Sequence, residues 1–434
     1  VGFVDHAVEG CALSGGSACD ALVRIDLRQG PVRLAADNSV DRGQLAVGQT
    51  LVIRFPRRVH AVQPGETLYS ISQSYGVSLR QLWRNNWSLG GNTALQPGQQ
   101  LVISYLDAKL GTALLNGYAY PFIDSALLAE QLPYLTDLAP FTYGITAAGG
   151  LLPLTDEALI SAARQHGTAP VMHLSTLTES GQFSTERAES VLSDKTMQAE
   201  LIRQVVENMQ AKGFAGLDVD FEYLPGSLSG DYAAFLARLR QILRPLGRFL
   251  WVALAPKTSA AQQGLLYEGH DYAALGRAAD AALLMTYEWG YTYGPPIAVA
   301  PLPNVRAVLD YAVTELPPAK ILLGVPNYGY DWPLPFVQGQ TRAQSISNQH
   351  AIELAIQYSI AIQYDGTAQA PYFHYTDASG TVHEVWFEDA RSLEAKLRLI
   401  AEYGFLGAGI WNIMRPFSQL WLVADSLYDI EPPF

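Results

Sequence analysis

The 434-residue sequence predicts an α/β protein, a (β/α)8 TIM barrel with a small α+β insertion that is preceded by two small modules. After residue 110, eight short apolar runs alternate with amphipathic helical patterns. Strands that are apolar throughout and joined by helices form a parallel sheet buried on both faces. Eight such units favour a closed barrel. A doubly wound sheet is the alternative, but the sequence has no Gly-rich phosphate turn and such sheets usually have fewer strands.

The charge balance excludes several classes of partner. Acidic residues number 41 and basic residues 28, a net charge of −13, which argues against nucleic acid and against an anionic membrane surface. No apolar run reaches the roughly 18 residues of a membrane span, and the first residues lack a secretory-signal pattern. We expect a neutral or cationic ligand, no nucleic-acid or membrane partner, and a monomer.

Two cysteines, Cys11 and Cys19, lie close together in a Gly/Ser-rich stretch. They are either a small disulfide loop or two incidental thiols. Two sulfurs without a nearby His fall short of the four ligands of a structural zinc site. We therefore expect no metal and no cofactor.

An internal repeat marks the first part of the chain. LAVGQTLVI, residues 45–53, recurs fifty residues later as LQPGQQLVI, residues 95–103, with six of nine positions identical. Two modules of about 50 residues are therefore predicted, at residues 1–56 and 57–106.

The second module has a readable order of elements. A short strand from His60 leads to a Pro-Gly turn, a helix closed by Gly76, a second helix from Leu79 and a final strand, which gives βααβ. Over residues 60–103 this sequence resembles the LysM family, whose modules bind chains of N-acetylglucosamine. The resemblance implies that sugar lies between two loops, although both loops are also explained as ordinary turns. The implied glycan-binding residues are Gly65, Glu66, Thr67, Leu95, Gln96 and Pro97.

The first module keeps the terminal strand of the repeat, but its opening VGFVDHAVEGCALSGGSAC departs from the turn pattern of the family. We interpret residues 1–56 as a degenerate LysM module.

The barrel is predicted over residues 110–434. A helix over 193–213, with a stripe from Met197 to Met209, begins at a capping Ser193 and ends at Gly213. The predicted strands are 114–122, 138–145, 169–175, 213–223, 249–256, 281–289, 321–330 and 404–413.

The gap between the seventh and eighth predicted strands is about 75 residues, too long for one helix and its turns. It contains a helical pattern, SISNQHAIELAIQY, followed by the strand-like pieces PYFHYT and VHEVWFE. We predict a small α+β insertion at about 332–390, on the face of the barrel that carries the site.

The fourth predicted strand contains GLDVDFEY, with carboxylates on alternate residues. Residues two apart in a strand share one face at a spacing of about 6.5–7 Å, so Asp218, Asp220 and Glu222 form an inward ladder. Burying three charges costs several kcal/mol each unless they are paired or protonated, and proton sharing raises the pKa of some members. A carboxylic acid held neutral near pH 7 suits protonation of a leaving group. A divalent-cation site or a satisfied internal network are the alternatives.

These residues resemble the DxxDxDxE signature of glycoside hydrolase family 18, with Ala215 in place of its first Asp. MTYEW, which contains Tyr287, resembles the sixth-strand motif of the family, and Trp411 fits its sugar-stacking Trp. Glu288 stands where many members have Asp. With the two modules, and with GYAYPF at the first strand, the chain resembles bacterial spore cortex-lytic N-acetylglucosaminidases.

The resemblance implies retaining hydrolysis in which the substrate's own N-acetyl group is the nucleophile. Glu222 is then general acid and base, Asp220 holds the acetamido N–H, and Asp218 tunes Asp220 through a shared proton. Tyr287 hydrogen-bonds the acetamido oxygen. His173 is interpreted as a core histidine outside the site.

The high aromatic content fits a sugar cleft, because rings pack on the apolar faces of pyranoses. The predicted substrate-binding residues are Trp411, Tyr118, Tyr143, Tyr223, Glu288, Trp289 and Tyr328.

Two alternatives to a cortex peptidoglycan hydrolase remain open. Inactive family 18 lectins bind sugar without cleaving it, but they usually lose the Glu or the middle Asp, and both are present here. A chitinase differs only in substrate, since chitin and peptidoglycan both display N-acetylglucosamine. In either case we expect an extracytoplasmic location, at a bacterial cell wall or spore envelope.

Overall fold

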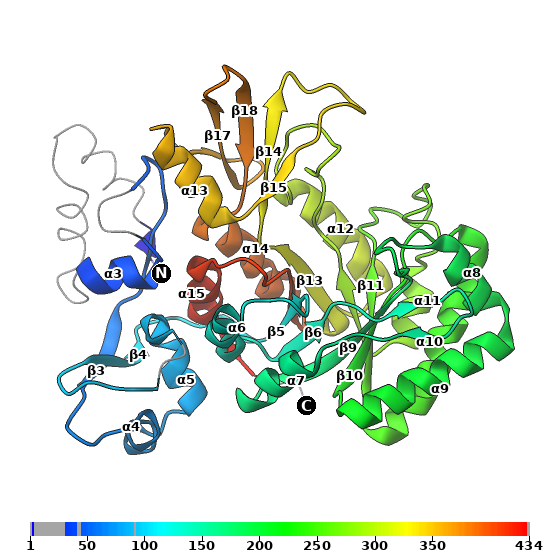
Figure 1. Cartoon of the computed structure of the whole chain (residues 1–434), viewed down its shortest axis with the longest axis horizontal. Coiled ribbons are helices and arrows are strands. Elements are labelled where there is room, and N and C mark those ends of the chain that lie inside the picture. The colour runs from blue at the N-terminus through cyan, green and yellow to red at the C-terminus, as the bar shows by residue number, and fades with distance from the viewer. Residues whose placement is uncertain (1, 4–30, 41–44, 91–92, 432–434) are drawn as a thin grey trace.

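The computed structural model describes residues 2–3, 31–40, 45–90 and 93–431. Figure 1 shows three parts: the barrel, an insertion above it, and a small N-terminal module at the lower left. Among the described residues, no helix combines the length and apolar character needed to cross a bilayer.

Eight parallel strands close into a barrel, as the sequence predicts, because the first strand pairs with the last as well as with the second. The strands in chain order are β5 (Gly111–Ala119), β6 (Asp137–Pro140), β9 (Ala169–Ser175), β10 (Gly216–Asp220), β11 (Phe249–Leu254), β12 (Ala281–Leu284), β13 (Ile321–Pro326) and β19 (Gly407–Trp411). A short additional strand, β20 (Tyr428–Ile430), pairs with the beginning of β5.

Most of these strands end earlier than predicted. The fourth strand was predicted over 213–223, but β10 ends at Asp220. The chain then leaves the sheet, and Tyr223 adopts a left-handed conformation with φ 55°. Glu222 is therefore on a loop, two residues beyond the strand that carries Asp218 and Asp220.

Helices cover the outside of the barrel (Figure 1). The helices are α6 (Ser125–Gln131), α7 (Glu157–Gln165), α8 (Thr185–Ser193), α9 (Lys195–Lys212), α10 (Ser229–Leu243), α11 (Tyr272–Ala278), α12 (Leu302–Glu315), α14 (Ala390–Tyr403) and α15 (Ser418–Leu427). The predicted cap at Ser193 is wrong, because Ser193 is the last residue of α8. Asp194 caps α9 instead, since its side chain accepts hydrogen bonds from the first-turn amides of Thr196 and Met197. Gly213 ends α9 in the left-handed conformation, as predicted.

The predicted α+β insertion forms a five-stranded antiparallel sheet between β13 and α14. Its elements are β14 (Gly329–Leu334), β15 (Gln344–Ile346), α13 (Asn348–Gln357), β16 (Gln363–Asp365), β17 (Ala370–Thr376) and β18 (Val382–Trp386). Because it follows the carboxyl end of β13, the insertion stands on the face of the barrel where the strands end.

The module before the barrel has the predicted βααβ order. Its elements are β3 (Pro56–Ala61), α4 (Leu68–Tyr75), α5 (Leu79–Arg84), a 3₁₀ turn η1 (Trp87–Leu89) and β4 (Gln100–Tyr105). Leu68, Ile71 and Leu82 from the helices pack against Leu101 and Ile103 from β4 in a separate small core. Thr67 caps α4, and Ser78 caps α5.

Only part of the first predicted module is described. A short helix, α3 (Pro31–Asp37), lies beside a two-stranded pairing of β1 (Gly2–Phe3) with β2 (Val52–Ile53). Cys11 and Cys19 lie outside the described residues, so the disulfide and the degenerate LysM fold stay predictions.

The βααβ module docks on the face of the barrel where the strands begin. Arg80 donates hydrogen bonds to the carbonyl oxygens of Pro133 (2.8 Å) and Gly167 (3.0 Å), which precede β6 and β9. Arg84 donates to the carbonyl oxygen of Ile430 (3.0 Å). These contacts place the module at the end of the barrel opposite the insertion.

A buried charge cluster strengthens this joint. Asp425 on α15 is fully buried and forms ion pairs with Arg54 (2.9 Å), Arg84 (3.2 Å) and Lys109 (3.8 Å). Arg54 also pairs with Asp107, in the segment between β4 and β5. We call Asp425, Arg54, Arg84 and Lys109 the docking cluster.

Candidate active site

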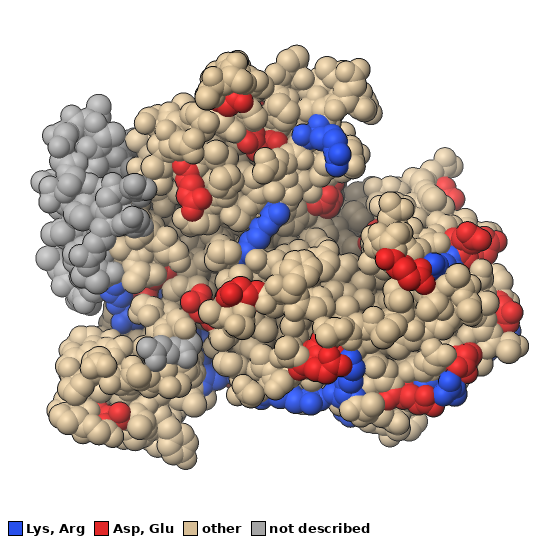
Figure 2. All heavy atoms as spheres, in the orientation of Figure 1, with Lys and Arg blue, Asp and Glu red and all other residues tan. Residues whose placement is uncertain are grey.

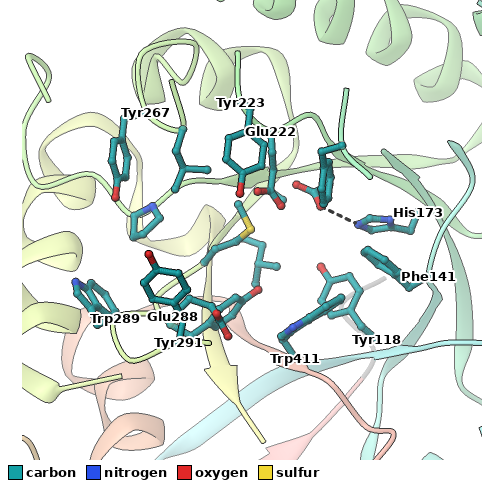
Figure 3. A pocket seen from close by; sticks show the side chains of 18 residues that line it. Tyr118, Phe141, His173, Glu222, Tyr223, Tyr267, Glu288, Trp289, Tyr291 and Trp411 are labelled. Carbon is teal, nitrogen blue, oxygen red and sulfur yellow. Dashed lines mark ion pairs between the residues drawn. The ribbon is translucent and has the colours of Figure 1, made fainter. Parts of the chain in front are cut away.

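A cavity of about 450 Å³ opens at the carboxyl ends of the barrel strands (Figure 3). Eight of the eleven predicted barrel site residues line it: Asp220, Glu222, Tyr118, Tyr223, Tyr287, Glu288, Trp289 and Trp411. They come from the ends of β5, β10, β12 and β19, so strands far apart in sequence converge on one volume.

The carboxylate ladder begins inside the barrel and ends at the cavity. Asp218 and Asp220 are both buried, whereas Val219 and Phe221 pack in the core on the other side of β10. Asp218 lies below the cavity, where the hydroxyl of Tyr118 donates a 2.7 Å hydrogen bond to its Oδ2. The other oxygen of Asp218, Oδ1, and Oδ1 of Asp220 are buried without a hydrogen-bond partner among the described residues.

Burial and mutual repulsion shift the ladder toward its neutral forms. Burial raises the pKa of Asp218 to about 6. Burial, then the charges of Glu222 and Asp218, raise the pKa of Asp220 well above its usual range. Burial, then the charge of Glu288, raise the pKa of Glu222 to about 7. Carboxyl groups that hold protons near neutral pH at a cavity wall are suited to acid–base chemistry.

The interpretation of His173 as a core residue outside the site needs correction. His173 is buried and its Nδ1 is paired with Thr142 Oγ1 (2.6 Å), as a core histidine would be. Its Nε2, however, faces the ladder, 3.6 Å from Asp220 Oδ2 and 3.8 Å from Asp218 Oδ2, and the ring lines the cavity (Figure 3). Burial lowers the pKa of His173 to about 3, so the ring is neutral at physiological pH. The sequence showed one histidine on a strand but not the strand's register with Asp218, which brings it to the site.

Glu288 lies across the cavity from the ladder (Figure 3). It follows Tyr287 and adopts a left-handed conformation with φ 66°, so the two neighbouring side chains both reach the cavity. Its carboxylate accepts hydrogen bonds from the hydroxyls of Tyr328 (2.5 Å) and Tyr330 (3.1 Å). Burial nevertheless raises its pKa.

Two predicted substrate-binding residues do not line the cavity. Tyr328 is buried and is engaged with Glu288, so it supports the cavity wall from behind. Tyr143 is buried against Phe214, and its hydroxyl donates to Asp156 (2.7 Å), which points the side chain away from the ladder. Tyr143 and Tyr328 are predicted to bind substrate because they are aromatic residues near strand ends. That pattern does not tell which side of the barrel wall a ring occupies.

Aromatic rings form much of the cavity wall. Trp411 packs against Phe141 (ring centroids 4.8 Å apart) and Tyr118 (5.6 Å). Several other wall residues were not predicted: Phe141, Phe183, Leu266, Tyr267, Met285 and Tyr291. Only Met285, within the quoted MTYEW, and Tyr291, just after it, carried a signal, since both are near a residue that was recognised.

The predicted glycan-binding loops of the small module lie at one end of it. Val62 exchanges backbone hydrogen bonds with Gly98 and Gln99, which brings the turn at 63–67 beside the loop at 95–98. Glu66 accepts hydrogen bonds from the amide of Gln63 (2.7 Å) and from His60 (2.6 Å). Its carboxylate therefore stabilises the turn, while the other loop residues are largely exposed.

A resident metal was not expected. Within the described ranges, His, Cys, Asp and Glu side chains do not gather in groups of three or more that could hold a metal ion. On the face of the molecule in Figure 2, acidic and basic side chains are interspersed over a mostly uncharged surface.

Comparison with known proteins identifies the family of each part of the chain. Residues 175–415 match glycosyl hydrolases family 18, and residues 60–104 match the LysM domain. The chain is 45% identical to the cortical fragment-lytic enzyme of Bacillus subtilis over 303 residues, 69% of this chain and 70% of that protein.

Two crystal structures are similar over nearly the whole chain. The Bacillus cereus spore cortex-lytic enzyme SleL is 36% identical with a TM-score of 0.81, and covers 96% of this chain and 97% of its own. The Bacillus megaterium enzyme SleL is 35% identical with a TM-score of 0.80, and covers 97% and 98%. The chain is therefore a glycoside hydrolase that belongs to glycosyl hydrolase family 18 and carries a LysM domain ahead of its barrel.

Proposed function

We propose that this hydrolase cleaves β-1,4 bonds at N-acetylglucosamine in peptidoglycan, with retention of configuration and with the substrate's acetamido group as the nucleophile. The observation that carries the proposal is the convergence of Glu222, Asp220 and Tyr287 on one cavity, with Glu222 held partly protonated near pH 7. A protonated Asp220 is a poor nucleophile, which favours a nucleophile supplied by the substrate.

In the first step, Glu222 protonates the glycosidic oxygen while the acetamido oxygen attacks the anomeric carbon. The leaving sugar departs with that proton, and an oxazolinium ion forms on the remaining sugar. Tyr287 donates a hydrogen bond to the acetamido oxygen and aligns it for attack. In the second step, ionised Glu222 takes a proton from water, which opens the oxazolinium ring and restores the acid.

Asp220 and Asp218 manage the charge of the intermediate. As positive charge develops next to Asp220, its proton moves toward Asp218, and Asp220 becomes the anion that holds the acetamido N–H. The unpaired Oδ1 atoms of both residues, together with the Tyr118 hydrogen bond that favours ionised Asp218, support this exchange.

Spore cortex fragments are the proposed natural substrate. The name of the B. subtilis relative is a cortical fragment-lytic enzyme, and the two similar crystal structures are spore cortex-lytic enzymes. In the LysM domain, we propose that a glycan chain binds between the loop of Gly65, Glu66 and Thr67 and the loop of Leu95, Gln96 and Pro97. We therefore propose an extracytoplasmic location, at a bacterial cell wall or spore envelope.

A chitinase is the second candidate. The cavity is lined by aromatic, apolar and acidic residues, with no Lys or Arg among them, so its inner part suits an uncharged sugar as well as a peptidoglycan fragment.

The deciding experiment is mass spectrometry of the products from spore cortex fragments, vegetative peptidoglycan and chitooligosaccharides treated in parallel. New reducing-end N-acetylglucosamine from cortex material alone supports the proposal. Equal or faster cleavage of chitooligosaccharides supports a chitinase. Cleavage of a substrate without the N-acetyl group would contradict the mechanism.

A further inference from the structure

Glu222, the proposed general acid, lies in a segment without regular secondary structure, and contacts with neighbouring elements hold that segment in place. Glu222 lies past the end of β10, so the sheet no longer fixes its backbone. The segment 221–224, which we call the acid segment, includes the left-handed residue Tyr223. Its carbonyl oxygens need partners from elsewhere, and those partners determine where the Glu222 carboxyl points.

Hydrogen bonds from the loop before α11 and from the first residue of α8 reach three carbonyl oxygens of the acid segment. Nε2 of His270 lies 2.9 Å from the carbonyl oxygen of Phe221. The amide of Gly269 donates to the carbonyl oxygen of Leu224 (2.9 Å), and the hydroxyl of Thr185 donates to that of Tyr223 (2.8 Å). Hydrogen bonds therefore fix the backbone on both sides of Glu222.

The contacts of His270 fix its tautomer. The backbone amide of Ala255 points at Nδ1 at 2.8 Å, and an amide can only donate, so Nδ1 carries no proton. A neutral ring must then carry its proton on Nε2, which donates to Phe221, since a carbonyl oxygen can only accept. His270 thus joins the end of β11 to the acid segment.

The surroundings of His270 hold this arrangement in place. The side chain is fully buried, and Lys257 Nζ donates to the carbonyl oxygen of His270 (3.0 Å). Burial lowers the pKa of His270 to about 4, so it stays neutral at physiological pH. Next to it, a Cβ on Gly269 would lie only 2.2 Å from Leu224 Cβ, so the loop approaches the acid segment as closely as glycine allows.

We infer that His270 and Thr185 are positioning residues for Glu222: the His270 ring and the Thr185 hydroxyl hold the backbone on either side of the general acid. Neither residue lines the cavity. The inference rests on the proposed role of Glu222.

The chain offers matched substitutions that separate this role from a merely structural one. In His270→Asn, the side-chain oxygen can take the place of Nδ1 and accept from Ala255, but nothing reaches Phe221. In His270→Gln, the amide can supply both an acceptor and a donor. Thr185→Val removes the hydroxyl at constant shape, and Thr185→Ser keeps it.

We expect His270→Asn to lower kcat about 10- to 100-fold, because a small displacement of a catalytic group is costly, with KM changed much less. His270→Gln should recover most of this loss. Thr185→Val should lower kcat by a smaller factor, and Thr185→Ser should not.

The pH profile provides a second readout. Glu222 faces Asp220 at the end of β10, Tyr223 beside it, and Tyr287 and Glu288 after β12. A loosened acid segment exposes Glu222 to water, which lowers its pKa, so the alkaline limb of kcat should move to lower pH in His270→Asn. Tyr428→Phe is the control, since it removes a buried hydroxyl that donates to Leu397 (2.7 Å), away from the cavity. It should lower Tm and leave kcat and the limb unchanged.

Several outcomes would overturn the inference. One is a folded His270→Asn variant with wild-type kcat and an unmoved limb, and another is a loss that His270→Gln shares in full. If His270→Asn does not fold, equal kcat in Thr185→Val and Thr185→Ser overturns it. Glu222→Gln distinguishes failure of this inference from failure of the proposed function. An active Glu222→Gln variant would show that Glu222 is not the general acid, and the proposed function would then fail. If Glu222→Gln is inactive, the outcomes above bear on His270 and Thr185 alone.

Discussion

Two regions of this molecule bury carboxylates, with opposite results. At the cavity, Asp220 is buried beside other acids, and its pKa is raised well above the usual range. In the docking cluster, burial alone would also raise the pKa of Asp425, but Arg54, Lys109 and Arg84 outweigh it and lower the pKa. Asp220 and Asp425 are both buried, so the charges of the neighbouring side chains decide whether the pKa is raised or lowered. A carboxylate among cations is a fixed structural charge, and a carboxylate among carboxylates holds a movable proton.

The largest effect at the cavity is expected from Glu222→Gln, which tests the role of Glu222 as general acid. The amide cannot deliver a proton to the leaving oxygen, so kcat should fall by at least about 100- to 10,000-fold. Calorimetric titration with a chitooligosaccharide should show that binding remains. Glu353→Gln, at an exposed acid of α13, is a control that should keep full activity. An active Glu222→Gln enzyme would assign the acid role elsewhere.

The strongest test of the docking side is Asp425→Asn. Removing the central acid of this buried cluster takes away the ion pair of Arg84 and one ion pair each from Arg54 and Lys109, so the free energy of unfolding should fall by about 3–5 kcal/mol. Urea denaturation measures this change. Asp429→Asn removes an exposed acid 4.0 Å from Lys109, and should cost no more than about 1 kcal/mol. Equal effects of the two substitutions would contradict the special role of Asp425.

The same cluster predicts a pH dependence of stability. Because the folded-state pKa of Asp425 is below the unfolded value, its contribution is fully present above the unfolded pKa of about 3.9 and is lost as pH falls through the folded pKa. Denaturation midpoints measured from pH 7 downward should therefore fall less steeply in Asp425→Asn than in the wild type. Parallel curves would show that Asp425 is not linked to acid unfolding.

A smaller effect is expected from Tyr118→Phe. This substitution removes the hydrogen bond to Asp218 Oδ2 without changing the ring beside Trp411. The hydrogen bond keeps Asp218 ionised and able to take the proton of Asp220, so its loss should raise the pKa of Asp218 and lower kcat. The loss in kcat should be at most about 10- to 100-fold, the equivalent of the 1.5–3 kcal/mol of a hydrogen bond to a charged group. Tyr143→Phe is the matched control, since its hydroxyl binds Asp156 outside the cavity. A larger loss in Tyr143→Phe would reverse the assignment of the two tyrosines.

The smallest effect is a shift in the pH profile of Glu288→Gln. As the proposed general acid, Glu222 must be protonated, so activity should decline as pH rises through about 7. The charge of Glu288 helps to keep that pKa high, so its removal should lower the pKa and move the alkaline limb to lower pH. A limb that stays in place, or moves to higher pH, would show that Glu288 does not act on Glu222.

Periodicity predicted the barrel well, because alternating strands and helices leave few other arrangements. The residues that line the cavity were harder to predict. Asp218, Asp220 and Glu222 were visible as a local pattern, but His173 and Phe141 reach them only through strand register and barrel closure. Tyr143, like Tyr118, lies near the end of a predicted strand, but its hydroxyl binds Asp156 instead. Which face a side chain occupies after a strand ends depends on loop conformation, as at Tyr223, and single-sequence patterns do not carry that information.

The joint between the LysM domain and the barrel also determines what truncation would do. The segment between β4 and β5 contributes Asp107 and Lys109 to the joint, so it is anchored chain and not a flexible tether. Removing residues 1–106 would leave Asp425 buried without Arg54 and Arg84. The domain is thus not a detachable accessory. A glycan-binding domain held at one fixed orientation adds avidity only for glycan that contacts both the domain and the cavity in that geometry.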